Sequence, residues 1–132
     1  MADGLILETT FLIDLERELT RGEAGRAQEF LAAHAPASLF TTFTVAGEMA
    51  VGFAPDERAR WQGYIAPFKV LPCTSDVCWQ YGQTFRYLRA NGLSIAANDL
   101  WIAATALVFQ QPVVTDNQRH YGRVPGLSVL GY

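Results

Sequence analysis

Hydrophobic positions along the chain follow two alternating patterns. Short, continuous apolar runs, typical of strands covered on both faces, occupy residues 5–7, 38–41, 68–71, 113–114 and 127–130. Between these runs, apolar residues recur at helical spacing over residues 9–17, 22–34, 44–53, 55–65, 75–91 and 99–110. The alternation predicts an α/β domain in which a mostly parallel, five-stranded sheet carries helices on both faces.

Polar residues at the starts of the helical segments are candidate N-caps, whose side chains accept hydrogen bonds from the first free N–H groups. Thr9 or Thr10 would cap the first helix, and Asn98 would cap the last. Ser75 or Asp76 would cap the helix before it. Other acidic residues have the settings of surface charge, namely Asp14, Glu16, Glu18, Asp56 and Glu57.

The length of 132 residues suits one domain, so residues 1–132 are expected to form a single unit with a substantial core. Half of the residues are hydrophobic and 17% are charged, which argues against disorder. The net charge of −3 is not typical of a nucleic-acid binder. Arginine nevertheless supplies nine of the ten basic residues and suits phosphate contacts. The candidates are Arg86, Arg89, Arg119 and Arg123.

The two cysteines and the N-terminus bear on the cellular compartment. Cys73 and Cys78 have neither C-x-x-C spacing nor the spacing of a zinc site, so we expect reduced thiols. The N-terminus carries Asp3 and no basic cluster, unlike a signal peptide. No apolar run approaches the roughly 18 residues of a membrane span. These features favour a soluble, cytoplasmic protein.

Acidic and amide side chains stand where apolar elements begin or end. Glu8 follows the first strand, Glu48 lies within an apolar helix, and Asp99 opens the most apolar helix. The pair Asp116 and Asn117 follows the fourth strand. In open parallel sheets, ligands bind beyond the carboxyl ends of the strands. Carboxylates gathered there repel one another, and a hard divalent cation is the usual remedy. The chain is therefore predicted to be a metal-dependent enzyme.

Four segments resemble a known family in order and over nearly the whole chain. They are LILETTFLI (5–13), TVAGE (44–48), NDLWIAATA (98–106) and VTDNQRHY (114–121), followed by VPGL (124–127). Together they resemble the motifs of PIN-domain ribonucleases of the VapC toxin type. The resemblance implies a three-layer α/β/α fold, one or two Mg²⁺ or Mn²⁺ ions, and hydrolysis of RNA phosphodiester bonds. It also implies a VapB-like antitoxin partner in a type II toxin–antitoxin system.

The resemblance assigns roles by position. The catalytic residues would be Glu8, Glu48, Asp99 and Asn117, and the metal ligands Glu8, Glu48, Asp99 and Asp116. Thr9, Thr115, Arg86 and Arg119 would orient ligands or substrate. Whether Asp116 or Asn117 faces the metal stays open at this point.

Glu8 departs from the family, which usually places Asp at this position. The extra methylene moves the carboxylate by roughly 1.5 Å, one carbon–carbon bond. A misplacement of about 1 Å can slow a reaction on the order of 100-fold. The alternative hypothesis is therefore an attenuated or inactive PIN-like domain that acts by binding RNA or protein. A phosphotransfer receiver or phosphatase would need Asp after the first strand and a well-placed lysine, whereas the single lysine, Lys69, opens a strand.

Two protein interfaces are expected. A groove for an amphipathic antitoxin segment would be lined by Leu12, Leu15, Phe30, Leu31, Phe53 and Trp61. A homodimer, implied by the resemblance, would pair through the helix at residues 75–90 and the start of the Asp99 helix.

Overall fold

The computed structural model describes residues 4–132 and contains one parallel sheet. Its strands are β1 (Gly4–Leu7), β2 (Ser38–Thr42), β3 (Lys69–Leu71), β4 (Val113–Val114) and β5 (Val129–Leu130). They lie in the order β3-β2-β1-β4-β5, and every pairing is parallel. This arrangement confirms the predicted α/β class and the five-stranded sheet.

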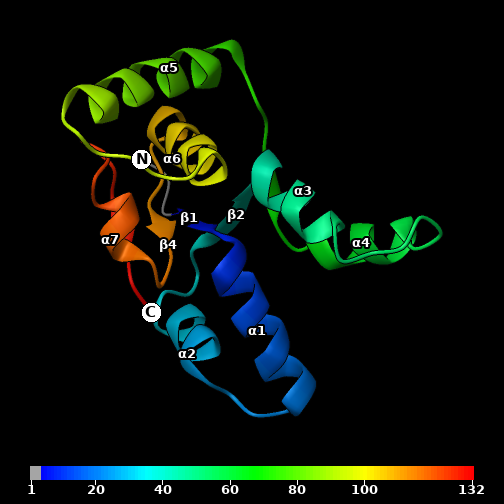
Figure 1. Cartoon of the computed structure of the whole chain (residues 1–132). Helices are drawn as coiled ribbons and strands as arrows, with labels where there is room; N and C mark the ends of the chain where they lie inside the picture. The colour runs from blue at the N-terminus through cyan, green and yellow to red at the C-terminus, as the bar shows by residue number, and fades with distance from the viewer. Residues whose placement is uncertain (1–3) are drawn as a thin grey trace.

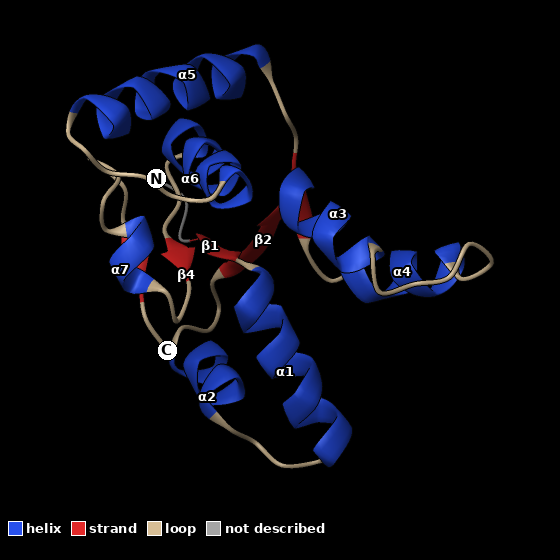
Figure 2. Cartoon of the chain, viewed as in Figure 1, coloured by secondary structure: helices blue, strands red, loops and turns tan. Residues whose placement is uncertain are grey.

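Helices cover both faces of the sheet (Figures 1 and 2). They are α1 (Thr9–Arg21), α2 (Arg26–Ala33), α3 (Phe43–Ala50), α4 (Arg58–Ile65), α5 (Ser75–Ala90), α6 (Ala97–Phe109) and α7 (Gln118–Tyr121). Helices α1 and α2 lie together on one side of the strands, and α6 lies on the other side with α5 outside it. None of the helices in residues 4–132 combines the length and apolar character that crossing a membrane needs.

Strand β1 is the centre of the fold. Its apolar residues are buried because β2 and β4 flank it and helices cover both faces. The chain leaves β1 for β2 on one side and later returns to form β4 on the other side, so the strand order reverses here. Leu7 pairs with Val114, which brings Glu8 and Thr115 to the same edge of the sheet. This edge is where ligands bind in open parallel sheets.

Helix α6 is apolar around its circumference because it lies between the sheet and α5 (Figure 1). Ile102, Ala103 and Ala106 belong to the main core cluster. On the side toward α5, the rings of Trp101 and Tyr81 stack with centroids 4.0 Å apart. Both sides of α6 are thus held by packing, which fixes the position of its first turn.

Several predicted helix starts were wrong. Glu8 caps α1 in place of Thr9 or Thr10, and Thr74 caps α5, where its Oγ1 accepts from the N–H of Val77 at 3.2 Å. Helix α6 begins at Ala97 after Ala96, which provides no side-chain cap, so Asn98 lies inside the first turn. N-caps are decided by which residue turns out of extended backbone, and several neighbours offer suitable side chains.

Three other elements also differ from expectation in detail. Helix α4 begins at Arg58 and not at residue 55, so Pro55 lies in the turn before it. The last strand is shorter than the predicted run at 127–130. Helix α7 was not predicted, because four residues are too few to show a helical period.

Glu18 is buried, and its prediction as surface charge was wrong. Its carboxylate accepts hydrogen bonds from the backbone N–H groups of Gly25, Ala27 and Gln28 at 2.9–3.0 Å. Burial alone would raise the pKa of Glu18, but these donors outweigh it and hold the pKa below its usual value. Glu18 therefore supplies the cap that Gly25 cannot provide for α2.

Candidate active site

Glu8 lies at the carboxyl end of β1 and is 4% exposed. Its Oε1 accepts from the N–H of Thr10 at 3.1 Å and from Thr115 Oγ1 at 3.2 Å. The Thr10 hydroxyl donates to the same oxygen. The carboxylate thus folds back onto the first turn of α1, where it serves as the N-cap.

Asp99 stands in the first turn of α6 and is half-buried. The hydroxyl of Tyr121, from α7, donates to Asp99 Oδ1 at 3.2 Å. Tyr121 itself is 1% exposed. Its pKa is raised by burial and by the charges of Asp99, Glu8 and Glu48, so the phenol stays protonated and available as a donor.

Glu48 lies in the second turn of α3 and is held from two sides. Thr9 Oγ1 donates to Glu48 Oε1 at 2.6 Å, and Asn98 Nδ2 donates to Glu48 Oε2 at 3.2 Å. These two bonds connect α3 to the start of α1 and to the start of α6. Glu48 is thereby brought to the edge of the sheet at which Glu8 follows β1 and Asp99 lies in the first turn of α6.

The carboxylates of the cluster perturb one another. Burial raises the pKa of Glu8, hydrogen bonds from Thr10 and Thr115 offset part of the rise, and the charge of Asp99 adds to it. Burial likewise raises the pKa of Asp99, the Tyr121 hydrogen bond opposes the rise, and the charge of Glu48 adds to it. Glu8, Glu48 and Asp99 therefore form a cluster of like charge, called the acidic cluster below.

Asp116 and Asn117 face different neighbours. Asp116 is exposed, and its Oδ1 lies 3.0 Å from the Thr10 hydroxyl, whose single proton it shares with Glu8. Asn117 places its Nδ2 2.9 Å from His120 Nδ1. The charge of His120 lowers the pKa of Asp99. Asp116 thus extends the acidic cluster on the Glu8 side, and Asn117 lies on the side of His120.

No arginine or lysine neutralises these acids in the part of the chain that the structure describes. The ion pairs found within residues 4–132 join Arg26 to Asp14 and Arg60 to Glu57. Oxygen donors bearing unpaired negative charge are the chemistry that Mg²⁺ and Mn²⁺ prefer. The donor set therefore fits a divalent cation, although within residues 4–132 no three His, Cys, Asp or Glu side chains are already grouped as ligands.

The predicted orienting residues are distributed unevenly. Thr9 and Thr115 donate directly to Glu48 and Glu8. Arg119 is exposed on α7, next to the residues that contact Asp99 and Asn117. Arg86 is exposed on the outer helix α5.

The other two arginines proposed for phosphate contacts have structural partners. The guanidinium of Arg89 lies 5.7 Å from the centre of the Phe85 ring, on α5. Arg123 donates to the carbonyl oxygen of Ser94 at 2.6 Å and so holds two loops together. The structure does not gather Arg86, Arg89, Arg119 and Arg123 on a single element.

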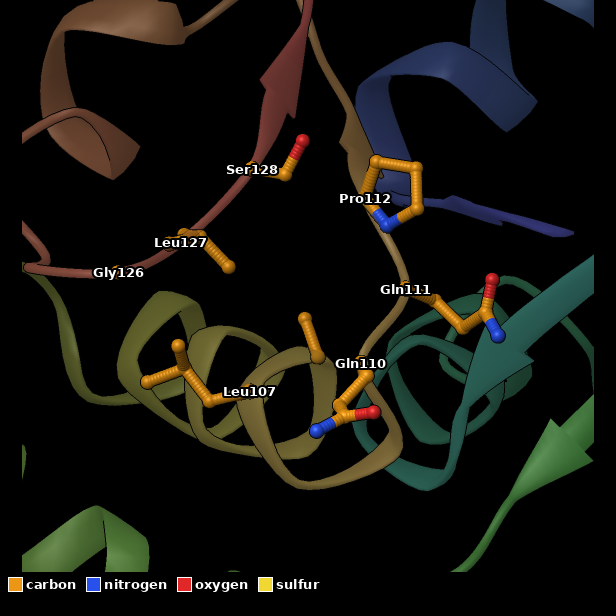
Figure 3. Close-up of a pocket in the computed structure, with 8 residues that line it drawn as sticks. Leu107, Gln110, Gln111, Pro112, Gly126, Leu127 and Ser128 are labelled. Carbon is orange, nitrogen blue, oxygen red and sulfur yellow. The ribbon is translucent and has the colours of Figure 1, made fainter. Parts of the chain in front are cut away.

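A hollow of about 420 Å³ lies at the opposite edge of the sheet (Figure 3). It is bounded by the end of α6, including Leu107 and Gln110, and by the segment from Gly126 to Ser128 that leads into β5. Pro112, which precedes β4, also lines it. None of the acidic cluster contributes to this hollow, so it is separate from the candidate site.

Sequence reasoning missed three residues that hold the acids in place. Thr10 joins Glu8 to Asp116, Asn98 anchors Glu48, and Tyr121 anchors Asp99. All three lie within the motif segments, beside the acids, which was the available signal. The Thr10–Glu8 contact is local, two residues apart, whereas the other three join residues 22 to 106 apart in the chain, which no local pattern indicates.

Replacing Asp99 with Asn should raise the melting temperature of the metal-free protein at neutral pH. The change removes one charge from the acidic cluster and keeps an oxygen for Tyr121. Because the folded-state pKa of Asp99 lies above 3.8, the parent gains stability as the pH falls through that raised pKa. The advantage of Asp99→Asn should thus be full at neutral pH and shrink in acid.

Thermal melts in a chelating buffer over a pH series measure this effect. Asp56→Asn is the control, because Asp56 is exposed on the loop before α4, and it should leave the melting temperature unchanged. Equal melting temperatures for Asp99→Asn and the parent at neutral pH would show that the acids do not repel one another.

Comparison with known proteins identifies the family. The model of the PIN domain matches residues 5–127. "Ribonuclease VapC" of Rickettsia bellii (strain RML369-C) is 28% identical over 96% of this chain and 95% of its own length. VapBC2 from Rickettsia felis, bound to a DNA fragment from its promoter, superposes with a TM-score of 0.80 at 19% identity, covering 97% of this chain and 98% of the other. VapBC-5 from Mycobacterium tuberculosis, a member of the VapBC family of toxin–antitoxin systems, gives a TM-score of 0.67 at 25% identity, covering 99% and 98%. With a match over residues 5–127, the chain belongs to the PIN domain family.

Proposed function

We propose that this protein is a metal-dependent endoribonuclease and the toxin of a type II toxin–antitoxin system. The observation that carries the proposal is the acidic cluster of Glu8, Glu48 and Asp99. Within residues 4–132, no arginine or lysine side chain forms an ion pair with these acids. The relative from Rickettsia bellii is a ribonuclease, and it aligns with 96% of this chain. The substrate that follows from this function is RNA, and the cellular location that follows is the cytoplasm.

The acidic cluster, with Asp116, would hold Mg²⁺ or Mn²⁺. Bound there, the cation supplies charge stabilisation for the phosphoryl group and lowers the pKa of water. The protein's own part is to hold the oxygen ligands in place. Thr9 and Asn98 fix both oxygens of Glu48, and Tyr121 fixes Oδ1 of Asp99. These three are positioning residues.

The reaction is hydrolysis of a phosphodiester bond. The oxygen of water bonds to phosphorus while one ester P–O bond breaks, and the water's proton ends on the departing oxygen or in solvent. Arg119 and Arg86 are exposed and free to contact phosphates of the RNA. Single-stranded or loop RNA suits such a site, because its unstacked bases can splay out onto aromatic side chains.

Asp99→Asn should abolish RNA cleavage that depends on Mg²⁺ or Mn²⁺. Asparagine keeps the shape and the Tyr121 hydrogen bond but removes the charge that a cation needs. Cleavage of a single-stranded RNA, followed at several metal concentrations, measures the effect. Asp56→Asn again serves as the control and should cleave normally. A protein with Asp99→Asn that retains the parent's rate and metal dependence would exclude this site.

Glu8→Asp is the complementary variant in the same assay. In the parent, every hydrogen bond to the Glu8 carboxylate found within residues 4–132 ends on Oε1 and involves Thr10 or Thr115. These hydrogen bonds hold the carboxylate away from a metal ligand's role and so favour the second candidate function, an attenuated PIN-like domain that acts by binding RNA or protein. The shorter aspartate side chain should raise the cleavage rate if the displaced carboxylate limits the parent. No cleavage by parent or variant would favour the binding function.

An apolar groove is the proposed docking site for an amphipathic segment of the cognate antitoxin. It has a volume of about 370 Å³ and is lined by Leu15, Glu16, Leu19, Leu39, Tyr64, Pro67 and Phe68. The predicted lining was wrong at Leu12 and Phe30, which are 1% and 9% exposed and belong to the core. Leu31, Phe53 and Trp61 line no part of this groove. Leu15 is the one predicted residue that lines it.

Leu19→Asp should weaken antitoxin binding by about tenfold or more, because a charge would enter the apolar contact. Leu19 is 62% exposed, so the fold should tolerate the change. Isothermal titration with the cognate antitoxin measures the affinity. Val51→Asp is the matched control, since Val51 is an 85% exposed apolar residue outside the groove. Equal affinities for Leu19→Asp and Val51→Asp would place the antitoxin elsewhere.

We also propose a homodimer that pairs through α5. This helix exposes large apolar side chains, with Trp79 71% and Tyr87 43% accessible. Light scattering at tens of micromolar should give the mass of a dimer for the parent. Trp79→Glu should give the mass of a folded monomer, which melts below the parent because association no longer stabilises it. A monomeric parent under these conditions would contradict the proposal.

A further inference from the structure

The two cysteines of the chain lie side by side at the protein surface. Cys73 is in the connection between β3 and α5, and Cys78 is in the first turn of α5. Their sulfur atoms are 3.7 Å apart, and both residues are exposed. The chain contains two cysteines in total, so no other thiol competes within the molecule. Neither residue belongs to the acidic cluster or to the apolar groove.

The helix cap holds the two thiols in this position. Thr74 is the N-cap of α5, and its Oγ1 accepts from Val77 N at 3.2 Å. The N–H of Cys78 donates to the carbonyl of Thr74 at 3.1 Å. Cys73 therefore precedes the cap, and Cys78 is the fourth helical residue. Apolar side chains at these two positions pack together in the hydrophobic staple.

We propose that Cys73 and Cys78 form a reversible intramolecular disulfide, a covalent form of the hydrophobic staple at the start of α5. The sulfur atoms must close from 3.7 Å to a bond length of about 2.05 Å. Because the capped turn already orients both residues, this approach needs side-chain rotation and a small local adjustment. An ordinary staple would use two aliphatic residues, whereas this one consists of two oxidisable groups.

The oxidant is a low-molecular-weight disulfide of the glutathione type, acting by thiol–disulfide exchange. One cysteine thiolate attacks a sulfur of the reagent, which breaks its S–S bond and releases one reduced thiol. The second cysteine thiolate attacks the protein sulfur of the mixed disulfide and releases the other. The protein loses two electrons and two protons, and the reagent gains both as two thiols.

The disulfide would fix the start of α5 to the end of β3. Helix α5 packs on α6 through the stacked rings of Tyr81 and Trp101, and α6 carries Asp99 in its first turn. Oxidation should thus restrain the helix that supports the candidate site, without any change in the site's own residues. A higher melting temperature, by a few degrees, is the expected shift because the crosslink constrains the unfolded chain.

The test incubates the full-length protein with mixtures of oxidised and reduced glutathione, followed by acid quenching and mass spectrometry. Trypsin should release residues 70–86 as one peptide that contains both cysteines. This peptide should become lighter by two hydrogen atoms as the proportion of oxidised glutathione rises. The change should reverse on reduction, and the oxidised protein should melt at a higher temperature than the reduced protein.

Cys73→Ala and Cys78→Ala are the matched controls, because alanine keeps the staple apolar. Each variant should accumulate a stable glutathione adduct, since no second thiol can displace it. Melts in reductant verify that both variants are folded. The proposal is wrong if the parent accumulates glutathione on both cysteines or forms disulfide-linked dimers. It is equally wrong if the parent stays reduced under conditions that modify the single variants.

Discussion

Repulsion among the carboxylates of the acidic cluster is the constraint that shapes this end of the molecule. Burial and mutual repulsion both raise the pKa values of Glu8 and Asp99, and the charges of all three acids act on Tyr121. An ordinary protein core would neutralise such charges with arginine or lysine. Here the neighbours are hydroxyl and amide groups, which hold the acids without cancelling their charge. The arrangement keeps negative charge available for a cation.

Each positioning bond joins two separate elements of the fold. Thr9 connects the start of α1 to α3, Asn98 connects α6 to α3, and Tyr121 connects α7 to α6. Helix α6 takes part in two of these links and is packed between the sheet and α5. The geometry of the candidate site therefore depends on core packing as well as on the acids. This dependence explains why such an apolar helix carries Asp99 at its exposed end.

Glu8 has both a structural position and a place in the candidate site. An acid at the end of the central strand is close both to the first turn of α1 and to the other carboxylates. In this chain the Glu8 carboxylate accepts from the N–H of Thr10 and caps the helix. The contact stabilises the start of α1 while the carboxylate remains buried beside Asp99. Structural capping and the proposed metal binding therefore compete for the same group.

The sequence by itself determined the strands, the six longer helices and the end of the sheet at which the acids lie. Apolar runs and helical periods are local properties, and Glu8 and Asp116 follow strands whose parallel order places their ends together. Tertiary structure decided the partners: Thr10 for Asp116, Tyr121 for Asp99, and the buried N–H groups of α2 for Glu18. It also placed Leu12 and Phe30 in the core and left Leu19 exposed. The physical reason is that periodicity identifies which face of a helix is apolar, whereas only the packing of distant segments determines which atoms meet.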